Sequence, residues 1–173
     1  MKYFKFFWKA HKWVGIVLSV VFINLAVTGI LLLVKKKFEW IQPPTQQGAE
    51  GTLEDFITVE QLFDIVLSQG HPDFQSLDDI DRVDFRPDKR VHKVLSLHHH
   101  SEIQIDAVTG AVLNQDQRVS DLLEDLHDGS FWGEWAHTYL MPLTGLGLLF
   151  MSATGLYLWL NIYTRKKRRL RKT

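Results

Sequence analysis

Two long apolar runs without an acidic or basic residue constrain this sequence more than any other feature. The first extends from Val14 to Val34, and the second extends from Ala136 to Ile162 with only His137 able to carry a charge. An uninterrupted stretch of more than about 18 apolar residues predicts a transmembrane helix. Aromatic residues gather at the ends of both runs, as in a membrane-interface belt: Trp8, Trp13, Trp40, Trp132, Trp135, Tyr139, Trp159 and Tyr163. The sequence therefore predicts a membrane protein with two spans.

Charge is distributed very unevenly along the chain. All 20 acidic residues lie between Glu39 and Glu134, and the middle of the chain, counted from Lys35, holds nine basic residues and has a net charge of −11. The two ends carry eleven Lys and Arg and no acid, including a basic tail from Arg165 to Lys172. The positive-inside rule then predicts cytoplasmic ends and an exported middle. Lys35–Lys37 argue locally for the opposite orientation, but a long loop follows them and lysines can snorkel. We also expect the basic tail to bind anionic lipid headgroups.

These features divide the chain into five segments. We expect a cytoplasmic N-terminus, a first span that is an uncleaved signal anchor, an exported domain with linkers, a second span and a cytoplasmic tail, at residues 1–13, 14–36, 37–134, 135–162 and 163–173. The chain has no cysteine. Disulfides and thiolate-bound haem or iron–sulfur clusters are therefore excluded, and a bound metal would need histidine, methionine or carboxylate ligands.

The predicted exported domain shows helical and then strand periodicity. Thr58–Gln61 fits a capping box, and the helix that it opens should end near Gly70. From Asp81 onward the apolar residues alternate with polar ones, a turn is expected at 106–110, and a short last strand begins at Ala111. The pattern predicts a small α+β unit of one helix against a few antiparallel strands.

Three consecutive histidines end one of the strand-like pieces. On a strand, His98 and His100 would share one face and His99 would point away, so His98 and His100 form a candidate site for a transition metal. The alternative is a solvated strand end at a turn. His71 and His92 have no such pattern, and we expect them at the surface.

A histidine and a Thr-Gly pair occur in both apolar runs. His11 precedes Gly29 by eighteen residues, and His137 precedes Gly155 by the same number. Eighteen residues are five helical turns, so each histidine and its glycine share a helix face. Because the spans run in opposite directions, this is a candidate inverted repeat. Small residues on these faces suit a close contact, which we expect in a homodimer: Gly15, Ser19, Ala26 and Gly29 with Gly145, Ser152 and Gly155.

The segments HKWVGIVLSVVFINLAVTGILL and LHDGSFWGEWAHTYL, with TGLYLWL, resemble the PepSY-associated transmembrane family. The segment EIQIDAVTGAVL resembles the end of a PepSY domain. The resemblance implies a two-helix hairpin with an exported PepSY-like α+β domain, forming a four-helix bundle as a homodimer. Larger members are similar to inner-membrane, haem-containing reductases of ferric siderophores. Small two-span members are associated with ferric reduction that supports ferrous iron uptake.

The resemblance nominates His11, His127 and His137 as ligands of a bis-His haem b. His11 and His137 would lie at opposite membrane faces, about 30 Å apart, so one hairpin cannot hold both on one iron. A parallel homodimer would pair each histidine with its twin and hold up to two haems. His127 could replace His137 or lie beside the ligands. Without haem, His11 would bind lipid headgroups and His137 would be satisfied by water.

Two function classes follow. The first is an inner-membrane redox protein that takes electrons from the cytoplasm or the quinone pool, reduces ferric iron or a ferric chelate outside, and supplies a ferrous iron transporter. The acidic exported segment would concentrate cations there. The second is a non-redox, membrane-anchored PepSY module that binds a peptide or protein partner. No pattern indicates a hydrolytic triad, a phosphate loop or a nucleic-acid surface.

Overall fold

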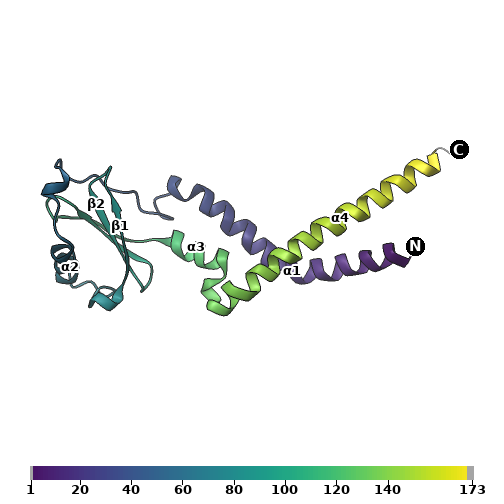
Figure 1. Cartoon of the computed structure of the whole chain (residues 1–173), viewed down its shortest axis with the longest axis horizontal. Coiled ribbons are helices and arrows are strands. Elements are labelled where there is room, and N and C mark those ends of the chain that lie inside the picture. The colour runs from purple at the N-terminus through teal and green to yellow at the C-terminus, as the bar shows by residue number, and fades with distance from the viewer. Residues whose placement is uncertain (1, 171–173) are drawn as a thin grey trace. The chain divides into compact units, whose positions relative to one another are not determined.

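The structure is a computed structural model that describes the backbone of residues 2–170 and the side chains of residues 3–164. Internal contacts divide the chain into two compact units. The helical unit consists of residues 1–30 and 124–173, and the sheet unit consists of residues 31–123. Figure 1 shows the order of the elements along the chain. The side chains of the basic tail from Arg165 onward lie outside the described residues.

The long helices of the structure agree with the two predicted spans. Helix α1 is Lys2–Val34 and helix α4 is Met141–Leu170. Both are long and apolar enough to cross a membrane, over Tyr3–Lys37 and Ala136–Thr164. Between the sheet and α4 lie helix α3 (Val119–Asp128), a 3-10 turn and a π-helical turn at Ala136–Leu140. The sequence analysis did not predict α3.

Glycines allow α1 and α4 to approach each other closely. A Cβ atom on Gly15 would lie 2.6 Å from Cε of Met151, and one on Gly147 would overlap Cδ1 of Leu18. Gly29 and Gly155 also face side chains of the same chain. These glycines therefore make close contacts within one protomer, and their use in a homodimer contact stays a prediction. Gly145 has no atom within 4 Å of its Cβ position.

The sheet unit is a four-stranded antiparallel meander in the order β1-β2-β3-β4. The strands are β1 Ile80–Arg86, β2 Val91–Ser96, β3 Ser101–Asp106 and β4 Val112–Gln117. Helix α2 (Val59–Ser68) begins with the predicted capping box, in which the Thr58 side chain accepts a hydrogen bond from the Gln61 amide at 3.2 Å. The α+β prediction is therefore confirmed, although the last strand extends further than expected.

One face of the sheet forms the hydrophobic core with α2. Because side chains alternate along a strand, the β2–β3 pairs Val94–Ile103 and His92–Ile105 point to this face. Leu62 and Val66 of α2 pack against it, together with the buried Phe74. Each such fully buried apolar side chain contributes about 1.5–3 kcal/mol.

The opposite face of the sheet is polar yet largely buried. Lys93, Glu102 and Gln104 have side chains on this face and are each at most 2 % exposed. The segment before α2 crosses it: the Gln46 amide donates to Oε1 of Gln104 at 2.8 Å, and Nε2 of Gln104 donates to the Pro44 carbonyl at 3.1 Å. Polar residues on a strand face are therefore covered here by chain rather than by water.

His92 is not a surface residue, contrary to the sequence prediction. Its ring stacks on that of Phe85 at 4.9 Å. Both ring nitrogens are buried and lack a hydrogen-bond partner among the described residues. Burial lowers the pKa of His92 because the charged form loses its hydration.

Candidate functional site

The first histidine of the helical unit is held by a hydroxyl of the opposite helix. Nδ1 of His11 in α1 lies 2.7 Å from Oγ1 of Thr154 in α4. The next residue, Gly155, faces the same ring, and a Cβ there would lie 3.4 Å from Cε1. The Thr-Gly pair therefore supplies one polar contact and the space for an imidazole.

A second histidine is held in the same way at the other end of α1. Nδ1 of His127, near the end of α3, lies 2.8 Å from Oγ1 of Thr28. A Cβ on Gly29 would lie 3.3 Å from Cε1 of His127. One turn earlier on α1, the side-chain amide of Asn24 donates to the Leu126 carbonyl at 2.8 Å and ties α3 to this helix.

Each threonine hydroxyl also contacts a carbonyl of its own helix. Oγ1 of Thr154 lies 2.7 Å from the Phe150 carbonyl and Oγ1 of Thr28 lies 2.7 Å from the Asn24 carbonyl. A hydroxyl has one proton, so an oxygen that donates it to the carbonyl accepts from Nδ1–H of its histidine. In that neutral tautomer Nε2 carries the lone pair, which is the form that a metal-binding imidazole needs.

The spacing related each histidine to a glycine of its own helix, His11 to Gly29 and His137 to Gly155. In the structure the Thr-Gly pairs contact histidines of other helices: Thr154 and Gly155 contact His11, and Thr28 and Gly29 contact His127. His137 lies in the π-helical turn with its side chain 55 % exposed. Its Nδ1 is 3.1 Å from the Asp128 carbonyl and 3.6 Å from the Asp128 carboxylate. The pairing was not predictable from spacing, because His127 belongs to α3 rather than to a span.

An apolar groove lies next to each histidine–threonine pair. A groove of about 580 Å³ next to the His11 pair is lined by Trp13, Val14, Val17, Leu18, Leu143, Leu146, Gly147 and Phe150. A groove of about 390 Å³ next to the His127 pair is lined by Val20, Val21, Asn24, Trp132, Trp135, Leu140 and Met141. Val14 is three residues from His11, and Asn24 is four residues from Thr28, so each groove begins one helical turn away from its pair.

The three consecutive histidines lie in the turn between β2 and β3, so strand alternation does not apply to them. His99 and His100 have left-handed backbone conformations, with φ of 53° and 55°. Nε2 of His98 is 3.0 Å from the Asp79 carboxylate, and Nδ1 of His99 is 2.8 Å from the Asp73 carboxylate. Within residues 3–164, no group of three or more His, Asp or Glu side chains is arranged to hold a metal ion. Metal binding by His98 and His100 stays a prediction.

Hydrogen bonds lower the pKa of Asp73 and Asp79, the two carboxylates that contact this turn. For Asp73 the largest cause is the hydrogen bond from Ser101, followed by the one from His99. For Asp79 it is the backbone amide of Ser76, followed by His98. The pairs stabilise the turn, and such contacts favour the ionised carboxylate.

A family model described as the PepSY-associated TM region matches residues 8–173. The chain belongs to the PepSY-associated TM family. A search of curated proteins gave no match. As a member of the PepSY-associated TM family with two candidate spans, the chain is a membrane protein with a PepSY-like domain between its apolar helices. Both histidine–threonine pairs lie within the matched residues.

The sequence analysis did not predict that Thr28 and Thr154 contact the histidines. The Thr-Gly dipeptide itself was visible in the sequence, once in the first apolar run at Thr28-Gly29 and twice in the second, at Thr144-Gly145 and Thr154-Gly155. What was missing was the partner of each hydroxyl, because a threonine in a membrane helix most simply bonds to its own backbone.

Proposed function

We propose that this PepSY-associated TM protein is an inner-membrane haem protein that passes electrons to ferric iron on the exported side. The observation that carries the proposal is the pair of histidines, His11 and His127, each held through Nδ1 by a threonine of the membrane helices. His11 lies within a candidate span, where an ionisable residue is costly, so a fixed histidine there favours a functional role. Haem bound at His11 and at His127 would supply a one-electron carrier at each of these two positions.

The residues around each pair fit such a group. The threonine orients the ring and keeps the proton on Nδ1, as the outer hydrogen-bond partner of a metal-binding histidine does. Nε2 remains available, because the hydrogen bonds of the described residues engage only Nδ1 of His11 and His127. The neighbouring apolar grooves offer a hydrophobic wall that would exclude water.

Within one protomer, His11 and His127 are too far apart to ligate the same iron. Seventeen residues separate His11 from Thr28, the partner of His127, which corresponds to about 25 Å along α1. Two axial imidazoles must face each other across a single porphyrin. The proposal therefore includes a parallel homodimer in which His11 pairs with its twin and His127 pairs with its twin. Such a dimer would form a four-helix bundle.

The geometry favours His127 over His137 as the second ligand. His127 is part-buried against Thr28, whereas His137 is exposed and bonded to the backbone. In this proposal His137 lies near the exported edge and does not hold haem. The acidic middle segment, with a net charge of −11, would attract ferric ions to that side.

The decisive experiment measures haem in the purified protein by the pyridine haemochrome assay, together with ferric reduction by membrane vesicles. His11→Ala and His127→Ala should each remove about half of the haem absorbance and abolish reduction. His137→Ala is the matched control, and it should keep its haem.

A wild-type protein expressed with sufficient haem that still contains none would overturn the redox proposal. The chain would then be a membrane-anchored PepSY module whose helices hold the domain at the surface, and the search for its partner would replace the search for a cofactor. Retention of haem by His127→Ala with loss in His137→Ala would instead exchange the roles of these two residues.

A further inference from the structure

A small polar pocket in the sheet unit has an unusually basic lining. Its volume is about 190 Å³. Five cationic residues and a single acid line it: Lys36, Arg86, Lys89, Lys93 and Arg118, with Asp88. The sheet unit carries an excess of acidic residues overall, so five cations around one small space are not the average character of this surface.

Three of these cations lack a carboxylate partner. No ion pair of Lys36 or Arg86 occurs among the described residues, and neither does one of Lys89. Nζ of Lys89 instead donates to the Thr45 carbonyl at 3.2 Å, which holds the ammonium in place without neutralising it. Their positive charge is therefore available to a ligand.

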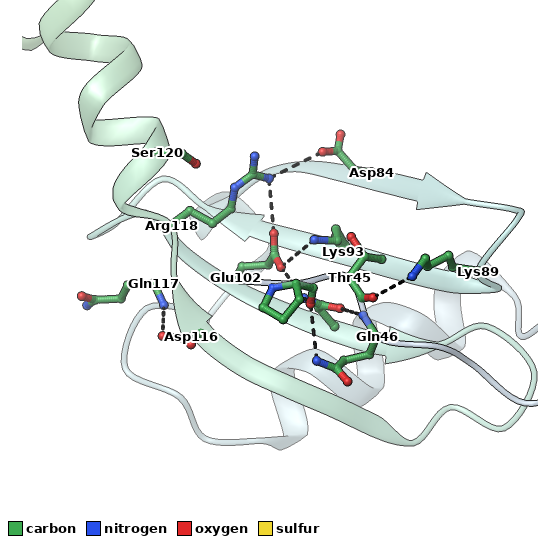
Figure 2. Close-up of polar contacts among 12 residues, drawn as sticks. Thr45, Gln46, Asp84, Lys89, Lys93, Glu102, Asp116, Gln117, Arg118 and Ser120 are labelled. Carbon is green, nitrogen blue, oxygen red and sulfur yellow. Dashed lines mark hydrogen bonds and ion pairs between the residues drawn. The ribbon is translucent and has the colours of Figure 1, made fainter. Parts of the chain in front are cut away.

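The other two cations, Lys93 and Arg118, both contact the carboxylate of Glu102 (Figure 2). The side chains of Lys93 and Arg118 are 2 % and 8 % exposed, and both contact Glu102, at 3.0 and 3.2 Å. Arg118 is further paired with Asp121 at 3.0 Å. Lys93 has one carboxylate contact, to Glu102, for three N–H donors. A buried ammonium with spare donors gains from an additional acceptor.

We propose that this pocket binds an oxyanion, meaning a phosphate or carboxylate group. The lining offers charged N–H donors that suit phosphate and carboxylate oxygens, and Arg86 can contact two oxygens at once. The volume is below the 300–1,000 Å³ or so of pockets for larger organic ligands, which limits the ligand to a small anion or a headgroup. Asp88 disfavours a second anion at the rim.

Two sources could supply this group. A soluble polycarboxylate such as citrate, or inorganic phosphate, would enter from solution. A lipid phosphate would enter from the membrane surface, since Lys36 follows the end of α1 by two residues. Both sources present the same chemistry to the pocket, and the proposal does not depend on haem.

The test uses the full-length chain in an uncharged maltoside detergent at low ionic strength. Citrate and inorganic phosphate are titrated by isothermal calorimetry, and phosphatidylglycerol is added in mixed micelles while the unfolding midpoint is followed. Binding of citrate or phosphate identifies a soluble anion, and a response to phosphatidylglycerol alone identifies a headgroup. In either case Arg86→Gln and Lys89→Gln should each weaken binding about tenfold.

Lys37→Gln is the matched control, because it removes one charge beside the pocket from a residue that does not line it. Lys37→Gln should weaken anion binding by less than about twofold, because a charge that does not contact the anion acts on it only through a screened long-range attraction. Arg86 is exposed, so Arg86→Gln should fold. Lys93 is buried and paired with Glu102, so Lys93→Gln is not needed as a test. Absence of binding by all three anions, or equal weakening by Lys37→Gln and Arg86→Gln, would overturn the proposal.

Discussion

Replacing Thr154 with valine tests the contact on which the proposed site depends. Valine keeps the shape of threonine but removes the oxygen that accepts the His11 Nδ1–H bond of 2.7 Å. Hydrogen bonds between membrane helices contribute about 0.6 kcal/mol on average and at most about 1.7 kcal/mol. Thr154→Val should therefore shift the unfolding equilibrium of the helical unit by roughly 3- to 16-fold. Haem affinity, where haem is bound, should fall about ten- to a hundredfold, as for other outer partners of ligating histidines.

Thr144→Val provides the matched control. Thr144 lies on the same helix, is 2 % exposed, and bonds at 2.9 Å only to the carbonyl of Leu140 in its own helix. Its loss should change stability far less, because no group of another helix is left unpaired. The assay is reversible unfolding in mixed dodecyl sulfate and maltoside micelles, followed by circular dichroism, with a haem titration in parallel. Equal effects of Thr144→Val and Thr154→Val in both assays would refute the reasoning.

Three further predictions concern packing, charge and pH. Gly155→Leu should displace the His11 ring and lower haem content, whereas Gly145→Leu, at a position with no neighbour within 4 Å, should not; the haemochrome assay compares them. Glu102→Gln should cost the sheet unit about 3–5 kcal/mol in urea unfolding, because it leaves a buried ammonium unpaired. His92 has a lowered pKa, so the unfolded state binds its proton first and stability should fall as pH drops below 6.5. His92→Phe should flatten that part of the pH profile, and an unchanged slope would contradict this assignment.

Several elements of the fold follow from local sequence alone. The two spans depend only on length and apolar composition, and the cap of α2 depends on Thr58 and Gln61 three residues apart. Strands β1 to β3 follow from alternation of polar and apolar residues. These features are set by neighbours in the chain, so no knowledge of distant partners was needed to predict them.

The site required the tertiary structure. Spacing related His11 to Gly29 and His137 to Gly155, whereas the structure brings His11 to Thr154 and His127 to Thr28. The reason is physical: an imidazole bonds to whichever hydroxyl the packing of helices brings within reach, and sequence separation does not encode that distance. Here the partners of the two bonds are 143 and 99 residues apart.

The burial of the polar face of the sheet also required the tertiary structure, although the identity of its residues followed from the sequence. The alternation of Lys93, Glu102 and Gln104 with apolar residues determined that these side chains share one face of the strands. Only the covering segment, which places the Pro44 carbonyl and the Gln46 amide on Gln104, decided that this face is buried. Periodicity distinguishes the two faces of a strand, but which face is exposed to solvent depends on which other segments of the chain cover it.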